Sequence, residues 1–308
     1  MRYDGGHKRD PFLMDAFAPH VEWVPVCPEV EVGMGTPREP VHLVAAAGGL
    51  RSAEHRVRLV GVQSGRDWTR AMARWCEDRV SELRRADLSG YILKKDSPSC
   101  GLQRVRVCVS PRAGSYIRTG RGLFAQALLD AMPNLPIEDE GRLHDPRIRE
   151  SFVERVFAYQ RVRRFFAGRW TVGDLVAFHT AHKLQLLSHS RQAYAVLGRL
   201  VARAASLPRR DLAVEYEAAF MTAWQRTATP GRHADVLHHM LGHLKRDLDD
   251  DSRRELLGLI EDHRKGLVPL VVPLTLIRHH VRQHRIEYLA GQVYLDPHPR
   301  ELCLRNHV

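Results

Sequence analysis

The period of the hydrophobic pattern changes near residue 150, and this change constrains the fold more than any other feature of the sequence. In the first 135 residues, short apolar runs typical of strands alternate with amphipathic stretches. The predicted strands are 22–26, 57–62, 90–93 and 105–109, and the clearest helix is 67–85 with Asp67 as its N-cap. From Ser151 onward the apolar positions repeat at helical spacing, and the predicted helices are 152–166, 172–187, 194–204, 212–224, 234–248 and 252–265.

Alternation of strands and helices predicts an α/β N-terminal half built on an open, mostly parallel sheet. The helical period after residue 150 predicts an all-α domain. Between them lies the polar segment 136–150, which is rich in proline and acidic residues. A length of 308 residues fits about two domains. We therefore expect one domain over 1–140 and a second over 150–308.

The charge balance is strongly basic. Lysine and arginine together number 47 against 36 acidic residues, which gives a net charge of +11. Such a surplus favours a polyanionic partner, because each phosphate contact releases counterions. Most of the basic residues are arginines, whose guanidinium group can form bidentate hydrogen bonds with a phosphate. A GC-rich coding sequence would enrich arginine too, so the composition alone leaves nucleic-acid binding open.

Neither a membrane span nor an export signal is visible in the sequence. The longest apolar stretch, 267–277, is interrupted by Pro269 and Pro273 and is too short to cross a bilayer. The opening residues contain no apolar segment of the signal-peptide type. These features predict a soluble, cytoplasmic protein.

The cysteines are odd in number and widely spaced: Cys27, Cys76, Cys100, Cys108 and Cys303. In a cytoplasmic chain this pattern favours a metal, cluster or catalytic role over a disulfide framework. Cys76 falls on the apolar stripe of a predicted helix and Cys108 within a predicted strand, so both are expected in the core. Cys303 is left unassigned.

Two cysteines are expected just beyond the ends of predicted strands, where α/β folds bind their ligands. Cys27 follows the run 22–26, although a lone cysteine there is more often a small core residue. Cys100 follows a Ser-Pro-Ser turn and precedes a glycine, which indicates an exposed position. Lys94 and Lys95 are near enough in sequence to favour its thiolate form.

Several segments of the first half resemble the thiouracil desulfidase family. They are Arg2-Tyr3-Asp4-Gly5-Gly6, Val24-Pro25-Val26-Cys27-Pro28-Glu29, Gly35-Thr36-Pro37-Arg38-Glu39-Pro40, Gly90-Tyr91-Ile92-Leu93-Lys94-Lys95 and Ser97-Pro98-Ser99-Cys100-Gly101. These motifs span most of residues 1–135 in a fixed order.

The second half resembles the YbgA-like domain. The matching residues are Phe178-His179, His182-Lys183, Leu187-Ser188-His189-Ser190, Tyr194, Leu197-Gly198, His239, Gly242, the segment 266–275, Gln292-Val293-Tyr294-Leu295 and Leu304-Arg305-Asn306. The two domains fused in this order resemble the tRNA 4-thiouridine desulfidases, which return 4-thiouridine in tRNA to uridine.

The resemblance implies a 4Fe–4S cluster held by three cysteines, with one iron open to the substrate's sulfur. Cys27 and Cys100 match two of these ligands. The family's third cysteine belongs to a segment that precedes the Arg-Tyr-Asp-Gly-Gly motif. We therefore expect Met1 to be an internal codon mistaken for the start, and the native protein to be longer. The chain as written is expected to lack a cysteine ligand and the first strand, and to be inactive.

The resemblance also implies catalytic roles for Glu29 and Ser97. Glu29 would position or deprotonate the attacking water. Ser97 would bind the substrate or relay a proton. The alternative for these two residues is structural: Glu29 would pair with Arg38, and Ser97 would cap the turn.

RNA binding is expected mainly on the helical domain. Arg161, Arg163, Arg164 and Arg169 are interleaved with three aromatic residues, a pattern typical of phosphate contacts combined with base stacking, and Lys183 is a further candidate. A solvated helix face is the alternative for this stretch. The pairs His179/His182 and His239/His243 have metal-ligand spacing. Hydrogen-bonding or RNA-facing roles are favoured for them.

The sequence therefore predicts an iron–sulfur-dependent enzyme that removes sulfur from 4-thiouridine in tRNA and releases sulfide. Two alternatives remain open. One is a desulfidase of free thiouracil, and the other is a non-catalytic RNA-binding or regulatory protein.

Overall fold

The computed structural model describes Asp4, Gly6 and residues 9–45, 57–110 and 114–308. Arg2, Tyr3 and Gly5 of the opening motif lie outside the described residues. The chain forms two compact units, Met1–Leu143 and His144–Val308.

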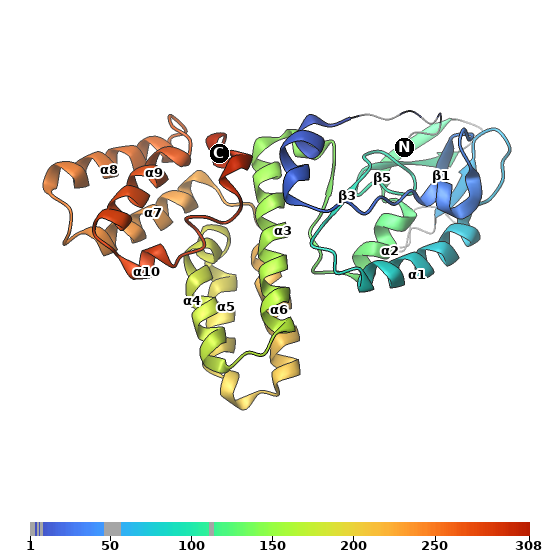
Figure 1. Cartoon of the computed structure of the whole chain (residues 1–308). Coiled ribbons are helices and arrows are strands. Elements are labelled where there is room, and N and C mark those ends of the chain that lie inside the picture. Colours follow the sequence, from blue (N-terminus) through green and yellow to red (C-terminus); the bar gives the residue numbers. More distant parts are fainter. Residues whose placement is uncertain (1–3, 5, 7–8, 46–56, 111–113) are drawn as a thin grey trace. The chain divides into compact units, whose positions relative to one another are not determined.

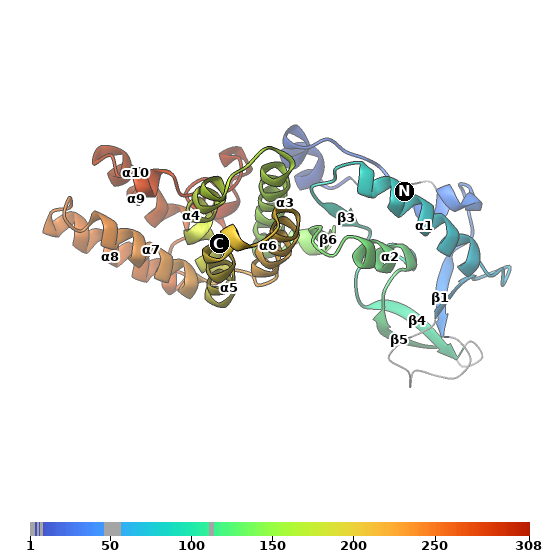
Figure 2. The same cartoon turned by 90° about the horizontal axis from the view of Figure 1, so that it is seen from below.

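The N-terminal unit contains two sheets (Figures 1 and 2). The larger has the order β2-β1-β4-β5, with bounds β2 Val57–Gly61, β1 Val41–Ala45, β4 Val105–Ser110 and β5 Ser115–Gly120. Its central pair, β1 and β4, is parallel, and both outer pairs are antiparallel. The smaller sheet pairs β3 (Tyr91–Leu93) in parallel with β6 (Ile137–Asp139).

Two helices complete the core of this unit. The apolar stripe of α1 (Thr69–Arg85) buries Met72, Cys76, Val80 and Leu83 at helical spacing. The helix packs against α2 (Leu123–Ala131), and the rings of Trp75 and Phe124 meet with centroids 5.3 Å apart. Asp67 does not cap α1 from the N-cap position, which Trp68 occupies, but its Oδ1 accepts the Thr69 N–H at 2.9 Å. Short helical turns are η1 (Phe12–Phe17), η2 (Ala18–His20), η3 (Val30–Met34) and η4 (Arg142–His144).

The predicted fold class, an α/β half with an open sheet followed by a helical half, is confirmed. The strand predicted at 22–26 is wrong. Residues 21–27 have no regular secondary structure, and the Trp23 and Val24 side chains are exposed. No described strand pairs with this run, so its apolar residues alone do not make it a strand.

The C-terminal unit is built from helices with clear start signals. The long helices are α3 (Pro146–Ala167), α4 (Val172–His189), α5 (Arg191–Ala202), α6 (Arg209–Ala223), α7 (Pro230–Leu244), α8 (Asp250–Arg264) and α9 (Val271–Gln283). Shorter ones are α10 (Glu287–Ala290), η5 (Ala204–Ser206), η6 (Arg300–Leu302) and η7 (Leu304–Asn306). Several N-caps accept backbone N–H groups through their side chains: Asp145, Thr171, Ser190, Thr229 and Asp249.

In this unit α4, α5 and α6 pack in sequence, and so do α7, α8, α9 and α10. In addition α3 packs against α6, and α4 contacts α7. Figure 1 shows α3–α6 as one group and α7–α10 as another, with α4 beside both. The sequence pattern does not predict a helix over 271–283, because Pro273 interrupts the apolar stretch. In the structure Pro273 lies in the first turn of α9, where its missing N–H has no helical partner to lose.

A buried ionic network ties the C-terminal segment to α3. Arg305 donates from Nη2 to Glu154 Oε1 at 3.0 Å and from Nε to Glu150 Oε1 at 3.3 Å. Glu154 also accepts from His189 Nε2 at 3.0 Å. All four side chains are buried.

The buried His182 makes the stability of this unit depend on pH. Burial and the neighbouring Arg161 guanidinium lower its pKa to about 3, so the folded state keeps it neutral where the unfolded chain, with an ordinary pKa of about 6.5, takes up a proton. Its stabilising contribution is full above pH 6.5 and falls as pH decreases toward 3. Between pH 6.5 and 5, we expect the protein to lose roughly 1.5 kcal/mol more stability than its His182→Asn variant.

Urea unfolding at a series of pH values measures this difference. The exposed His238→Asn variant is the control and should keep the wild-type slope. An unchanged slope in His182→Asn would contradict the assignment.

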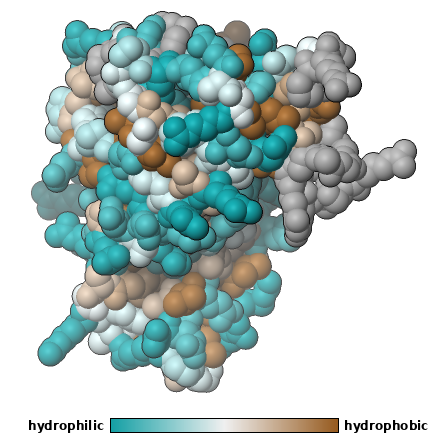
Figure 3. All heavy atoms as spheres, turned by 90° about the vertical axis from the view of Figure 1, so that its right-hand side faces the viewer, coloured by the Kyte–Doolittle hydropathy of each residue, from teal (hydrophilic) through white to brown (hydrophobic). Residues whose placement is uncertain are grey.

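No helix in the described part of the chain is long and apolar enough to cross a membrane. On the surface in Figure 3, hydrophilic side chains predominate and hydrophobic ones occur in small separate groups.

Candidate active site in the N-terminal unit

One cavity of about 240 Å³ brings together the four residues that the sequence singled out in this unit. They are Cys27, Glu29, Ser97 and Cys100. Cys27 and Glu29 belong to the segment before η3, and the other two belong to the loop after β3.

The backbone of Cys27 is fixed by the turn that follows it. Its carbonyl accepts the N–H groups of Val30 and Glu31 at 3.1 and 2.9 Å. Its own N–H donates to Glu31 Oε1 at 3.0 Å, so Glu31 closes the turn from both directions. The other carboxylate oxygen of Glu31 lies 3.4 Å from Arg79 Nε on α1, which anchors the turn to the helix.

The loop that carries Cys100 is bound to the start of α2. The free N–H groups of that helix end, from Phe124 and Ala125, point at the Ser99 carbonyl at 2.9 and 3.3 Å. Gly122, the N-cap of α2, lies so close that an added Cβ would stand 2.3 Å from the Ser99 oxygen. The helix end therefore determines where the Cys100 backbone lies.

Replacing Gly122 by Ala should destabilise the N-terminal unit by roughly 1–3 kcal/mol, because the Cβ meets backbone atoms that have little room to move. Denaturant unfolding measures the loss. The control is Gly242→Ala in α7, where an added Cβ meets nothing within 4 Å. This substitution should increase the free energy of unfolding by at most ~1 kcal/mol. Equal effects of the two substitutions would contradict this packing.

The carboxylate of Glu29 is held by hydrogen bonds to both of its oxygens. Arg38 donates to Oε2 from Nη2 at 2.5 Å and from Nε at 3.0 Å. Ser99 and Ser97 donate to Oε1 from their hydroxyls at 2.5 and 3.3 Å. The Arg38 side chain is only 4% exposed, so this pair is largely withdrawn from solvent. Four donors fix the orientation of the Glu29 carboxylate.

Ser97 caps its own turn as well as facing the cavity. Its hydroxyl oxygen accepts the N–H groups of Ser99 and Cys100 at 3.3 and 3.1 Å, and lies 3.0 Å from the Ser99 hydroxyl. Both structural roles expected as alternatives are thus present: Glu29 pairs with Arg38, and Ser97 caps the turn. They also leave Ser97 in contact with a fixed carboxylate.

Cys100 lies in an electrostatic environment that opposes ionisation. Burial, the charge of Glu29 and the nearby Cys27 raise the pKa of its thiol to about 12, against smaller opposite effects from Ser99 and Ser97. The expectation that Lys94 favours the thiolate form of Cys100 is wrong. Lys94 Nζ pairs with Glu140 at 2.5 Å, and the pKa of the thiol is raised, not lowered. A free Cys100 is therefore a thiol at neutral pH. A cation bound at this thiol would displace its proton and leave a thiolate.

Two further residues belong to the site and were missed in the sequence. Ser99 is fully buried and makes the shortest hydroxyl contact with Glu29. Tyr91 is close enough to both cavity cysteines for their charge to raise the pKa of its hydroxyl, although burial is the larger cause. The Ser-Pro-Ser sequence is the signal that could have indicated a role for Ser99 beside Ser97, since both hydroxyls donate to Glu29.

The other cysteines lie elsewhere. Cys76 and Cys108 are buried, and Cys303 is exposed in the C-terminal unit. Burial raises the pKa of Cys76 to about 12. In the described part of the chain, no group of three or more histidine, cysteine or acidic residues is arranged to hold a metal ion.

The residues expected to bind RNA do not form one continuous stripe. Arg161 points into the helical unit, where its Nε lies 3.2 Å from His182 Nε2 and its Nη1 donates to the Pro297 carbonyl at 2.8 Å. Arg164 and Arg169 are exposed, and Arg163 lies over the Tyr159 ring. The interleaved aromatic rings pack among themselves and onto α4 and α6: Phe165 on Phe178, Phe166 on Tyr216, and Trp170 on both phenylalanines.

The two histidine pairs differ in their surroundings. His179 and His182 are buried and hydrogen-bonded, to the Tyr216 hydroxyl and the Phe178 carbonyl. His239 and His243 are exposed, with ring centroids 5.1 Å apart. Lys183 lies near this second pair and over the Tyr288 ring, with its Nζ 5.8 Å from the ring centroid.

Comparison with known proteins assigns the two units separately. A family described as 2-thiouracil desulfurase matches residues 1–140, and one described as a protein of unknown function (DUF1722) matches residues 183–299. The uncharacterized protein YbgA of Escherichia coli (strain K12) is 31% identical over 161 residues, which cover 52% of this chain and 95% of YbgA. The uncharacterized protein YbbK of Bacillus subtilis (strain 168) is 28% identical over 100 residues, or 32% of this chain and 64% of YbbK. No solved structure matches.

The first family match covers the cavity with Cys27, Glu29, Ser97 and Cys100, and the relation to YbgA spans nearly all of that protein. The chain therefore belongs to the YbgA family, and its residues 1–140 match the family described as 2-thiouracil desulfurase.

Proposed function

We propose that this protein is an iron–sulfur-dependent desulfidase that converts 4-thiouridine in tRNA to uridine and releases sulfide. One observation carries the proposal: within a 2-thiouracil desulfurase domain, two cysteines, a fixed carboxylate and a serine line the same cavity. The net charge of +11 supports a polyanionic substrate rather than a free base.

The residues of the cavity fit part of the ligand set of a 4Fe–4S cluster. Cys27 and Cys100 would hold it, since thiolates are the soft ligands that such clusters need. A third thiolate ligand has no candidate among the described residues that line the cavity. When bound, the cluster would supply a Lewis-acidic iron that draws sulfur from a thiocarbonyl.

The chain's own residues would handle the water and its proton. Replacing the C=S bond by C=O consumes one water and releases the sulfur as sulfide. Ser97 bridges the cavity and Glu29, so a proton can pass from water through the Ser97 hydroxyl to Glu29 Oε1. Arg38 and Ser99 keep the carboxylate aimed at Ser97. This orientation is needed because a general base must lie within hydrogen-bond reach.

Glu29→Gln and Ser97→Ala should each lower kcat by roughly 10²–10⁴-fold, the usual contribution of general acid–base catalysis. Incubation of the full-length, reconstituted protein with thiolated tRNA, followed by nucleoside analysis, measures the conversion of 4-thiouridine to uridine. The exposed Glu22→Gln and Ser81→Ala variants are matched controls and should remain active.

The same assay discriminates the alternatives. Turnover of free thiouracil without any change in tRNA would support the free-base desulfidase. Binding of tRNA that weakens with salt, without turnover of either substrate, would support the non-catalytic protein.

A further inference from the structure

A second, larger cavity adjoins the candidate active site. It measures about 510 Å³ against about 240 Å³ for the active-site cavity. The two share three lining residues: Arg38, Glu39 and Val41. Because residues common to both form the wall between them, a ligand in the larger cavity lies next to the reacting group.

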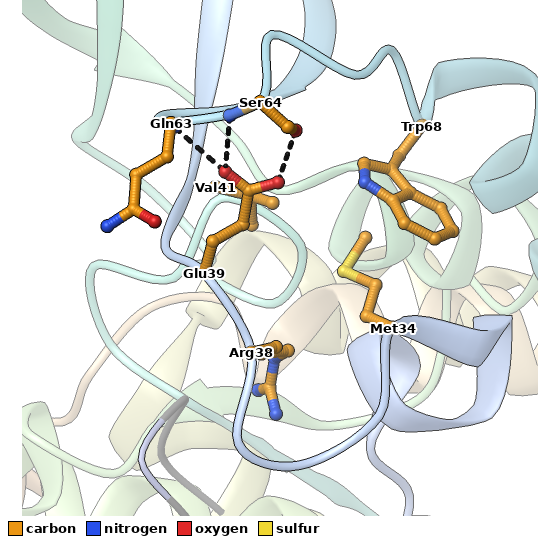
Figure 4. A pocket seen from close by; sticks show the side chains of 7 residues that line it. All are labelled: Met34, Arg38, Glu39, Val41, Gln63, Ser64 and Trp68. Carbon is orange, nitrogen blue, oxygen red and sulfur yellow. Dashed lines mark hydrogen bonds between the residues drawn. The ribbon is translucent and has the colours of Figure 1, made fainter.

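Arg38 and Glu39 face different partners across this wall. Arg38 directs its guanidinium to Glu29 in the active site. The Glu39 carboxylate accepts the N–H groups of Gln63 and Ser64 at 2.8 and 2.9 Å, and also the Ser64 hydroxyl (Figure 4). These bonds lower the pKa of Glu39. They also fix the turn after β2 to the wall that the two cavities share.

The remaining walls suit a flat aromatic ring. Figure 4 shows the Met34 thioether beside the Trp68 indole on one side, and Gln63 on the other with its amide end unbonded to the residues drawn. A methionine adapts to the shape of a ring, and an amide can bond the edge of a base. The volume lies within the usual range for small-ligand pockets, whereas the active-site cavity lies below it.

A cation lies against one of the residues that line the cavity. Arg66 is exposed and lies over the Trp68 ring, with its Cζ 3.9 Å from the ring centroid. Within the part of the chain that the structure describes, no carboxylate forms an ion pair with it. A guanidinium beside an aromatic wall is suited to the phosphate that links two nucleotides.

We propose that this cavity binds the nucleotide next to the thiolated one, so that the substrate of the active site is at least a dinucleotide. The proposal rests on the desulfidase function and extends it to the class of substrate. The base of the neighbouring nucleotide lies between Gln63 and the Met34–Trp68 wall, and Arg66 contacts the linking phosphate. A free thiopyrimidine or a single nucleoside leaves the cavity empty.

The test compares kcat/KM for a thiolated dinucleotide with kcat/KM for the nucleoside 4-thiouridine. Gln63→Ala and Arg66→Ala should each lower this ratio about tenfold, the scale of one lost base or phosphate contact. Arg84→Ala, which removes the same charge from an exposed position on α1, should keep the wild-type ratio. An unchanged ratio in both cavity variants would overturn the proposal. So would a loss that is equal for nucleoside and dinucleotide.

A binding measurement separates this proposal from the proposed function. An unthiolated dinucleotide that contains 2-aminopurine should lose fluorescence on binding, through stacking in the cavity, and should bind about tenfold more weakly to Gln63→Ala and Arg66→Ala. Binding of this kind without turnover of any thiolated substrate would retain the cavity and reject the desulfidase. Turnover of thiolated tRNA with no fluorescence change would retain the desulfidase function and reject the nucleotide-binding role of the cavity.

Discussion

Removal of either cavity cysteine should abolish both the iron–sulfur cluster and the activity of the reconstituted full-length protein. In Cys27→Ala or Cys100→Ala, one anchoring thiolate is lost. The residues that remain in the cavity, Glu29 and Ser97, offer only hard oxygen atoms, which are poor ligands for such clusters. Anaerobic reconstitution, the visible absorbance of the cluster and the bound-iron content measure the first effect. Nucleoside analysis of thiolated tRNA measures the second.

The other cysteines provide controls in the same chain. Cys76→Ala removes a buried thiol from the core of α1, and Cys303→Ala removes an exposed thiol from the other unit. Both variants should bind iron and retain activity, although Cys76→Ala loses some stability through the small cavity it creates. Activity retained in Cys100→Ala would end the assignment of the cluster. Iron loss in Cys303→Ala would show that another cysteine supplies a ligand.

Features that are local in sequence could be predicted from it. Helical periodicity predicted six of the helices after residue 150, because side chains three and four residues apart share a face whatever the tertiary context. Caps such as Thr171 and Asp249 act within one turn. The motifs around Cys27 and Cys100 likewise contain the four residues that meet in the candidate site, although the sequence does not show how their segments meet.

Features that depend on residues far away in the chain could not be predicted from the sequence. The strand β6 is only three residues long and contains Glu138 and Asp139, which are buried because the strand pairs with β3. Desolvation raises the pKa of Asp139 to about 6, an effect invisible in a segment that reads as a polar junction. The opposite error occurred at 22–26, where apolar residues have no pairing strand.

The same distinction applies to the arginines. In the sequence, Arg161 is equivalent to Arg164 and Arg169, because all three are basic residues near aromatic ones. In the structure, Arg161 is bonded to His182 and to the Pro297 carbonyl, which lies 136 positions further along the chain. A basic residue becomes an interior one when a distant acceptor reaches it, and spacing alone carries no sign of that acceptor.

Arg305 is the residue of the helical unit whose loss should cost most stability. Replacing it by Met keeps most of the side-chain volume but leaves Glu150 and Glu154 buried together without their cation. Burial and the charge of Glu154 raise the pKa of Glu150, and Arg305 opposes this shift, so removing Arg305 leaves the unfavourable effects uncompensated. Breaking a buried ionic cluster by removing one partner costs roughly 3–5 kcal/mol.

The control is Arg300→Met, which removes an arginine from the same segment. Arg300 pairs with Asp296 at 2.8 Å, but both side chains are at least half exposed, so its loss should cost no more than ~1 kcal/mol. Urea unfolding followed by circular dichroism compares the two. Arg305→Lys should recover only part of the stability. An ammonium donates from a single nitrogen, whereas the guanidinium reaches Glu150, Glu154 and the Tyr294 carbonyl from three separate nitrogens. Similar losses in the Arg305 and Arg300 variants would mean that Arg305 does not anchor the C-terminal segment to α3.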